Sequence, residues 1–141
     1  MILYLGTSSL AKLYIEEEYS NIVRGWVRQA EIVSTCRIAY TEMISSLDKR
    51  LKKHDLSQKD YDMIVKRFSH DWLHYAIVDF DEREAGLFIQ KYGLRRFDAI
   101  HLSAAKLIQK QHKDIHLVFS SANEILCNAV AAEGIHVLTY Q

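Results

Sequence analysis

The chain has 141 residues with 18 basic and 18 acidic side chains, so its formal net charge is zero. This length suits one compact domain spanning residues 1–141, and 49% hydrophobic residues supply a real core. A chain with no net charge cannot bind nucleic acid through an overall positive charge. Any such binding would depend on a local basic patch.

Sequence features also bear on the compartment of the protein. No run approaches the roughly 18 apolar residues of a membrane span, and the N-terminus lacks the basic and apolar regions of a signal peptide. Cys36 and Cys127 are distant from each other in sequence, which is more typical of reduced thiols than of a disulfide or metal pair. These features predict a cytoplasmic protein with no membrane attachment.

Short apolar runs alternate with helical patterns along the chain. Strands are predicted at 2–5, 31–34, 75–78, 116–119 and 136–138, and helices from 10, at 19–30, at about 38–53, from 58 to about 72, at 82–92, from 96 and from 124 to 132. This alternation predicts an α/β fold of three layers, α/β/α, with a central parallel sheet of about five short strands. The third and fourth helices are expected to form an antiparallel hairpin that projects from the sheet.

Cap residues mark several helix ends. Hydroxyl N-caps are predicted at Thr7, Ser8 and Ser9, capping boxes at Ser57 with Asp60 and at Ser121 with Glu124, an N-cap at Asp81, and C-terminal glycines at Gly93 and Gly134. In the third helix, one face is predicted to be core, and it comprises Ala39, Met43, Leu47 and Leu51. Glu42 lies off that face.

The stretch from Arg96 to Ala105 reads as a helix that opens with a carboxylate, Asp98. Ile100, Ala104 and Leu107 recur at helical spacing and predict its buried face. Taken alone, Asp98 is interpreted more simply as the cap of a core helix. It gains significance beside three other places: Gly6 after the first strand, Glu42 near a helix start, and Asn123 after the fourth strand. Sites in open parallel sheets gather beyond the carboxyl ends of the strands, so these four positions are candidates for one cleft.

Four segments together resemble the PIN domain, and specifically the VapC-type toxins of prokaryotic toxin–antitoxin pairs. Each segment alone is weak, but their order and spacing are fairly specific and span nearly the whole chain. The segments are LYLGTSSLAKLY at 3–14, AYTEM at 39–43, RFDAIHL at 96–102 and FSSANEIL at 119–126.

The resemblance implies a PIN-like fold and an endoribonuclease that uses Mg²⁺ or Mn²⁺ held by acidic side chains. On this chain it implies Glu42 and Asp98 as catalytic metal ligands, with Asn123 as an auxiliary ligand. Hard oxygen ligands suit Mg²⁺, which keeps several waters. The chain departs from the family at Gly6, where the first Asp is expected, and at Asn123, where a fourth Asp is usual. Catalysis is therefore predicted to be impaired.

The origin of Gly6 has more than one interpretation. It is either a natural feature of an inactive relative or a substitution made or selected because the active toxin poisons its host, and the intact neighbours favour the second. A purely structural role, in a tight turn with positive φ, is a further alternative.

Other residues near the candidate cleft have functional and structural interpretations. Thr7 and Ser8 orient a ligand or act only as N-caps, and Arg95 and Arg96 contact RNA phosphates or form a solvated helix entry. His101, one turn after Asp98, is interpreted as a packed core residue more readily than as a site residue.

The resemblance also implies partners: an RNA substrate, a cognate antitoxin protein and a second copy in a homodimer. Apolar residues around Tyr14, Tyr19 and Trp26 are either a docking surface or core. The alternative function is a non-catalytic PIN-like module that binds RNA or an antitoxin. A third hypothesis is an unrelated doubly wound domain in which Glu42 and Asp98 are structural.

Overall fold

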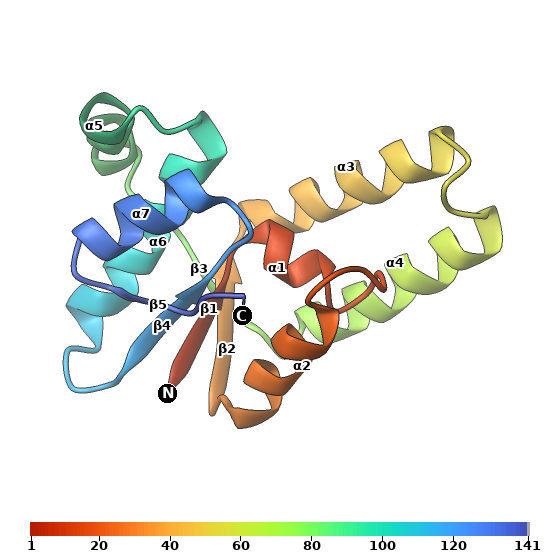
Figure 1. Ribbon diagram of the computed structural model, residues 1–141, viewed down its shortest axis with the longest axis horizontal. Helices are drawn as coiled ribbons and strands as arrows, with labels where there is room; N and C mark the ends of the chain where they lie inside the picture. Colours follow the sequence, from red (N-terminus) through yellow and green to blue (C-terminus); the bar gives the residue numbers. More distant parts are fainter. Residues whose placement is uncertain (141) are drawn as a thin grey trace.

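The computed structural model describes residues 1–140, and within them five parallel strands form one sheet between two layers of helices (Figure 1). The strand order is β3-β2-β1-β4-β5. The elements are β1 (Ile2–Leu5), α1 (Thr7–Ala11), α2 (Ser20–Gln29), β2 (Ile32–Cys36), α3 (Ile38–Lys52), α4 (Gln58–Trp72), β3 (Ala76–Val78), α5 (Glu82–Tyr92), α6 (Arg96–Gln111), β4 (Leu117–Ser120), α7 (Glu124–Ala132) and β5 (His136–Val137). The predicted three-layer α/β/α class is confirmed.

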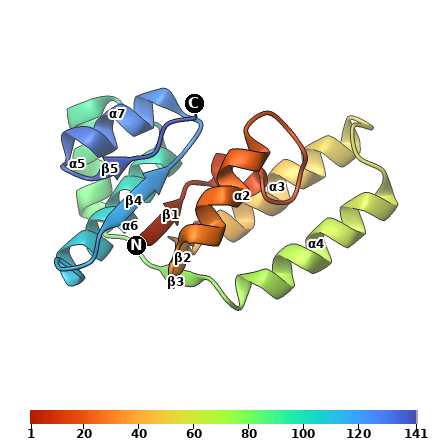
Figure 2. The ribbon, with the colours of Figure 1, turned by 60° about the horizontal axis from the view of Figure 1, so that its bottom comes forward.

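The central strand β1 is buried on both faces and divides the core in two. Ile2 and Tyr4 face one side and Leu3 and Leu5 face the other, as the two-residue period of a strand requires. The first side packs against α5, α6 and α7, and the second against α1 to α4. Both views show these helices on opposite sides of the sheet (Figures 1 and 2).

Helices α3 and α4 form the predicted antiparallel hairpin, whose tip extends away from the sheet (Figure 2). Ala39, Met43 and Leu47 are fully buried as expected, whereas Leu51 near the tip is only partly buried. Phe68 of α4 is fully buried and stacks on Tyr40 of α3 with ring centroids 5.2 Å apart. Phe68 also meets the Tyr14 ring edge-on at 5.3 Å, so aromatic packing fixes the base of the hairpin to the domain.

Helix starts differ from the prediction at two places. Helix α1 begins at Thr7 with Gly6 as its N-cap and no side-chain cap bond, so the hydroxyls do not cap it. Helix α7 is capped by Asn123, whose side chain accepts a hydrogen bond from the Leu126 amide, so the predicted Ser121–Glu124 capping box is wrong. Ser121 Oγ instead accepts a hydrogen bond from the Asn123 amide and lies 3.2 Å from Ser8 Oγ.

The buried face of α6 is wider than predicted. Ile100 and Leu107 are only partly buried, whereas the fully buried residues include Ala99, Leu102 and Ala105. Helix α6 lies between the sheet and helix α5, so small residues on several sides of it are enclosed.

Two findings concern the cysteines and helix hydropathy. Cys36 is buried, Cys127 is partly buried, and both are free thiols. Among residues 1–140, every helix is too short or too polar to cross a bilayer.

The two glycines of helix α5 make a matched test of backbone conformation. Gly93 ends α5 with φ +67°, a left-handed conformation, whereas Gly86 lies inside the helix with open space where a Cβ would be. We expect Gly93→Ala to lower the free energy of unfolding by about 1 kcal/mol. Gly86→Ala should raise it by about 0.5–1 kcal/mol. Urea denaturation of both variants checks this, and equal effects would contradict the assigned helix end.

Candidate active site

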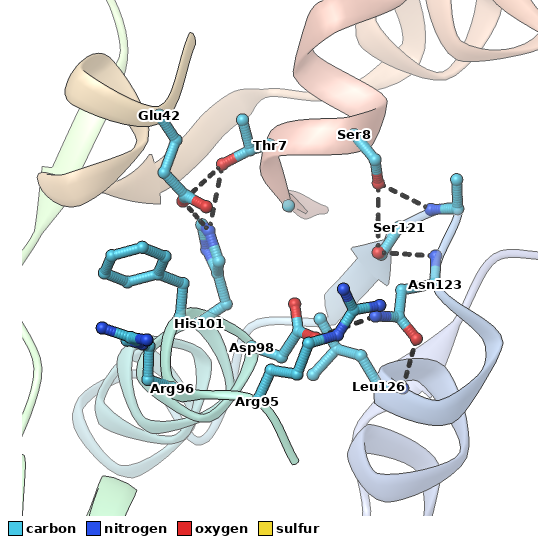
Figure 3. A pocket seen from close by; sticks show the side chains of 13 residues that line it. Thr7, Ser8, Glu42, Arg95, Arg96, Asp98, His101, Ser121, Asn123 and Leu126 are labelled. Atoms are coloured by element: carbon cyan, nitrogen blue, oxygen red, sulfur yellow. Dashed lines mark hydrogen bonds and ion pairs between the residues drawn. The ribbon is translucent and has the colours of Figure 1, made fainter. Parts of the chain in front are cut away.

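A cleft of about 610 Å³ opens at the carboxyl edge of the sheet, beside the ends of β1 and β4 (Figure 3). Strands β2 and β3 follow β1 on one side of it, whereas β4 and β5 lie on its other side. The cleft therefore lies at the point where the strand order reverses, which is the topological switch point of the sheet. The lining residues come from the end of β1 and the start of α1, from α3, from α6 and its start, and from the β4–α7 connection with the first turn of α7. They include all the predicted site residues: Gly6, Thr7, Ser8, Glu42, Arg95, Arg96, Asp98 and Asn123.

Glu42 reaches the cleft from the second turn of α3. Its Oε1 accepts a hydrogen bond from Thr7 Oγ1 at 2.7 Å and another from His101 Nε2 at 2.8 Å. Burial acts to raise the pKa of Glu42, but hydrogen bonding and electrostatic attraction from His101, together with Thr7, outweigh it and lower that pKa. Glu42 is therefore held as a carboxylate with one oxygen occupied and Oε2 without a protein donor among residues 1–140.

Asp98 lies in the first turn of α6 and faces the same cleft. Asn123 Nδ2 donates a 2.8 Å hydrogen bond to Asp98 Oδ2, and Arg95 Nε lies 3.8 Å from that oxygen. Burial raises the pKa of Asp98 above its usual value, and the charge of Glu42 adds to this, while Arg95, His101 and Asn123 act in the opposite direction. Asp98 and Glu42 therefore line one cleft from two different helices.

Gly6 occupies the end of β1 with φ −66° and ψ 159°, an extended conformation open to any residue. The suggested structural role, a turn needing positive φ, is therefore wrong. A Cβ at this position would lie 3.3 Å from Ser121 Cβ, which is a tight contact. Ser121 approaches because its Oγ is 3.2 Å from Ser8 Oγ, which also accepts from the Ala122 amide. The backbone at Gly6 thus admits an aspartate if Ser121 shifts slightly.

Arginine side chains flank the entrance of the cleft. The Arg95 side chain is 85% exposed, and the Arg96 guanidinium carbon lies 5.9 Å from the centroid of the Phe97 ring. Phe97 is exposed and lines both the cleft and a neighbouring groove along α3. The two arginines create a local positive potential on a chain whose total charge is zero. Such a local patch is what the sequence requires for nucleic-acid binding.

The oxygen atoms that face the cleft are few enough that they would bind a divalent cation only weakly. Glu42 and Asp98 each keep one oxygen clear of protein hydrogen bonds within the described residues, and one or two carboxylates suffice for Mg²⁺ when phosphate and water complete the shell. The oxygen of Asn123 already accepts the Leu126 amide bond. Among residues 1–140, no group of three or more His, Cys, Asp or Glu side chains is arranged as a metal site. The set fits one loosely held Mg²⁺ or Mn²⁺.

His101 combines the two interpretations that the sequence allowed, a packed core residue and a residue that faces the site. Its side chain is buried, as the core interpretation requires, yet it contacts Glu42 and Thr7 and lines the cleft. The i+3 spacing from Asp98 was the available signal, because it places both residues on one face of α6. Of the candidate docking residues, Tyr14 is buried core, and Tyr19 and Trp26 both stack on Tyr140.

Comparison with known proteins adds family information to this geometry. A sequence model described as the PIN domain matches residues 3–121. The chain is 24% identical over 107 residues to two proteins of Mycobacterium tuberculosis, Ribonuclease VapC45 of strain CDC 1551 / Oshkosh and Ribonuclease VapC49 of strain ATCC 25618 / H37Rv. Each match covers 74% of this chain and 74% of the relative.

Solved structures resemble the fold at low sequence identity. PAE2754 from Pyrobaculum aerophilum superposes with a TM-score of 0.68 and 14% identity, covering 97% of this chain and 89% of the other. FitAcB from Neisseria gonorrhoeae superposes with a TM-score of 0.65 and 18% identity, covering 99% of this chain and 97% of the other. A structure of FitAB bound to an IR36 DNA fragment superposes with a TM-score of 0.62 and 19% identity, covering 98% of this chain and 94% of the other. These likenesses establish the α/β fold with its five-stranded parallel sheet.

Proposed function

This chain belongs to the PIN-domain family, and from that premise we propose that it is a VapC-type endoribonuclease toxin with weakened metal-dependent catalysis. The observation that supports this is the convergence of Glu42 and Asp98 on one cleft at the switch point of the sheet. The distant relatives named as VapC ribonucleases share this lineage.

The proposed roles follow from the side chains that face the cleft. Glu42 and Asp98 would hold Mg²⁺ or Mn²⁺ through their unoccupied oxygens. Asn123, expected from the sequence as an auxiliary ligand, would instead support Asp98, because its oxygen caps α7 and its amide nitrogen faces the carboxylate. When bound, such an ion polarises a phosphate oxygen and lowers the pKa of a water molecule. Asn123 and Arg95 orient Asp98, and Thr7 and His101 hold Glu42.

RNA binding is proposed for the rim of the cleft. Arg95 and Arg96 would contact phosphates of the RNA strand, because their charged groups flank the two carboxylates. Ser8 lies at the cleft wall, where its hydroxyl would orient a phosphate or its bound water, whereas Thr7 donates its one hydroxyl proton to Glu42 and would not bind the phosphate. Arg95, Arg96 and Ser8 would position the phosphodiester, and they carry no step of bond cleavage.

Gly6 is the reason to propose weak catalysis. It leaves the end of the central strand without a carboxylate, so two negative ligands face the cleft instead of three or four. Loss of groups that merely support a metal ligand costs about 10–100-fold in affinity or activity, and a missing ligand should cost at least as much. The same observation favours the second candidate function, a PIN-like module that binds RNA or an antitoxin without cleaving it.

Metal binding by the chain as it stands tests the proposed site. We expect Mn²⁺, followed by electron paramagnetic resonance, to bind weakly at one site in the described cleft. Binding should fall by at least about 10-fold in Glu42→Gln and in Asp98→Asn. Lys110→Gln, on the far part of α6, is the matched control and should bind Mn²⁺ as the parent does. Equal binding by the parent and both cleft variants would contradict the site.

Partners and compartment complete the proposal. We propose a single domain that works in the cytoplasm as a homodimer and is neutralised by an antitoxin protein. Light scattering of the purified chain measures the dimer directly.

A further inference from the structure

His101 lies between the buried core and Glu42, one of the two carboxylates proposed to bind the metal. The residue is 2% exposed, yet both of its ring nitrogens have side-chain partners on other elements. Nε2 is 2.8 Å from Glu42 Oε1, and Nδ1 is 2.6 Å from the hydroxyl of Tyr4. A buried imidazole with both nitrogens engaged cannot turn without breaking two hydrogen bonds.

The partners of His101 determine which nitrogen carries a proton. An ionised carboxylate accepts only, so Nε2 must donate to Glu42. In the neutral ring Nδ1 is then the acceptor, and the Tyr4 hydroxyl donates a hydrogen bond to it. Burial, first, and the neighbouring charge of Glu42 keep the pKa of Tyr4 well above its usual value, so this hydroxyl retains its proton.

Tyr4 is itself fixed by the central strands. Its ring stacks on Phe119 of β4 with centroids 5.1 Å apart and planes 8° apart, and meets the His101 ring edge-on at 5.8 Å. Tyr4 is completely buried in β1, between β2 and β4. The sheet therefore fixes the position of Tyr4, and Tyr4 fixes the orientation of the His101 ring. That ring in turn fixes the position of one carboxylate oxygen of Glu42.

We propose that His101 is a positioning residue that holds Glu42 in its metal-binding orientation, with Tyr4 fixing the imidazole from the core. This inference deepens the proposed function and rests on it. Since His101 and Asp98 lie on one face of α6, this helix supplies one carboxylate and fixes the other, which α3 carries. Groups that hydrogen-bond metal-ligating carboxylates typically contribute about 10–100-fold to affinity or activity.

The test uses three replacements of His101 and the Mn²⁺ affinity of each. His101→Gln places an amide nitrogen near the position of Nε2 and should retain Mn²⁺ affinity within about 3-fold. His101→Asn reaches only toward Tyr4, and His101→Leu reaches neither partner, so both should lose about 10-fold or more. The melting temperature of all three variants is also measured. A purely structural role of His101 would lower the melting temperature without making the Mn²⁺ affinity of the Gln variant higher than that of the Asn and Leu variants. An unchanged affinity in His101→Leu would overturn the proposal.

Tyr4→Phe keeps the aromatic packing and removes only the hydroxyl. It should weaken Mn²⁺ binding less than His101→Leu does, since Thr7 and Nε2 still reach Glu42. An unchanged affinity here would remove Tyr4 from the proposal.

A spectroscopic measurement separates this inference from the proposed function. Long-range ¹H–¹⁵N correlation spectra of the parent, recorded without metal under conditions where the His101 ring is neutral, should show its proton on Nε2. A proton on Nδ1 alone would overturn the inference, because that tautomer cannot donate to Glu42. This result is independent of RNA cleavage, so the failure of the nuclease proposal and the failure of the positioning proposal give different outcomes.

Discussion

Gly6→Asp is expected to raise Mg²⁺- or Mn²⁺-dependent cleavage of RNA by at least about 10–100-fold. The substitution adds a carboxylate at the end of β1, on the wall of the cleft that Glu42 and Asp98 also line. The backbone angles at this position already suit an aspartate, so the gain requires only the slight shift of Ser121 that a Cβ at position 6 demands. The measurement is the cleavage rate of a fluorescently labelled single-stranded RNA with Mg²⁺, with Mn²⁺ and with EDTA.

Two further substitutions at the same position isolate the effect of charge. Gly6→Ala adds the Cβ that meets Ser121 without any ligand, and Gly6→Asn adds an amide of the same shape as aspartate. Neither should raise cleavage as Gly6→Asp does. The close contact with Ser121 is addressed by adding Ser121→Gly to Gly6→Asp, which removes the Cβ that position 6 would touch. If both aspartate variants fold, bind Mn²⁺ and leave the RNA intact, the endoribonuclease proposal is wrong and the non-catalytic module is favoured.

Asp98→Asn, added to Gly6→Asp, is expected to abolish the restored cleavage, with a loss of more than about 100-fold. The loss follows because the asparagine side chain offers no negative oxygen to the ion, whereas the shape of the residue and its contact with Asn123 are kept. A direct metal ligand contributes more than the groups that support it, whose loss costs about 10–100-fold. Cleavage of the same labelled RNA measures this loss.

Stability provides the control for Asp98→Asn. Burial raises the pKa of Asp98 in the folded state, so the ionised form is less favourable in the folded protein than in the unfolded chain. At neutral pH the charge therefore lowers stability, and a neutral asparagine should leave the melting temperature unchanged or raise it. A large drop in melting temperature would mean that lost folding, rather than a lost ligand, explains the lost activity. Cleavage that survives in a folded variant would remove Asp98 from the catalytic site.

The site was predictable from sequence where local patterns carry chemistry. The helical position of Asp98, the face of α3 that presents Glu42 and the strand ends near Gly6 and Asn123 all follow from periodicity and turn residues. The predicted caps at Thr7 and Ser121 were wrong, because contacts across the sheet edge compete with local capping for the same hydroxyls. The role of Asn123 as the cap of α7 was not predicted for the same reason.

The sequence by itself determined the alternation of strands and helices, the parallel sheet and the family to which the chain belongs. These depend on hydrophobic period and short motifs, which are local properties of the chain. The tertiary structure alone decided the strand order, which places β1 between β2 and β4, and the contacts of Tyr4, His101 and Glu42. Tyr4 and His101 are 97 positions apart, and no local pattern specifies which distant side chain a buried imidazole will meet. Only the packing of α3 and α6 around the central strands brings these groups within hydrogen-bonding distance.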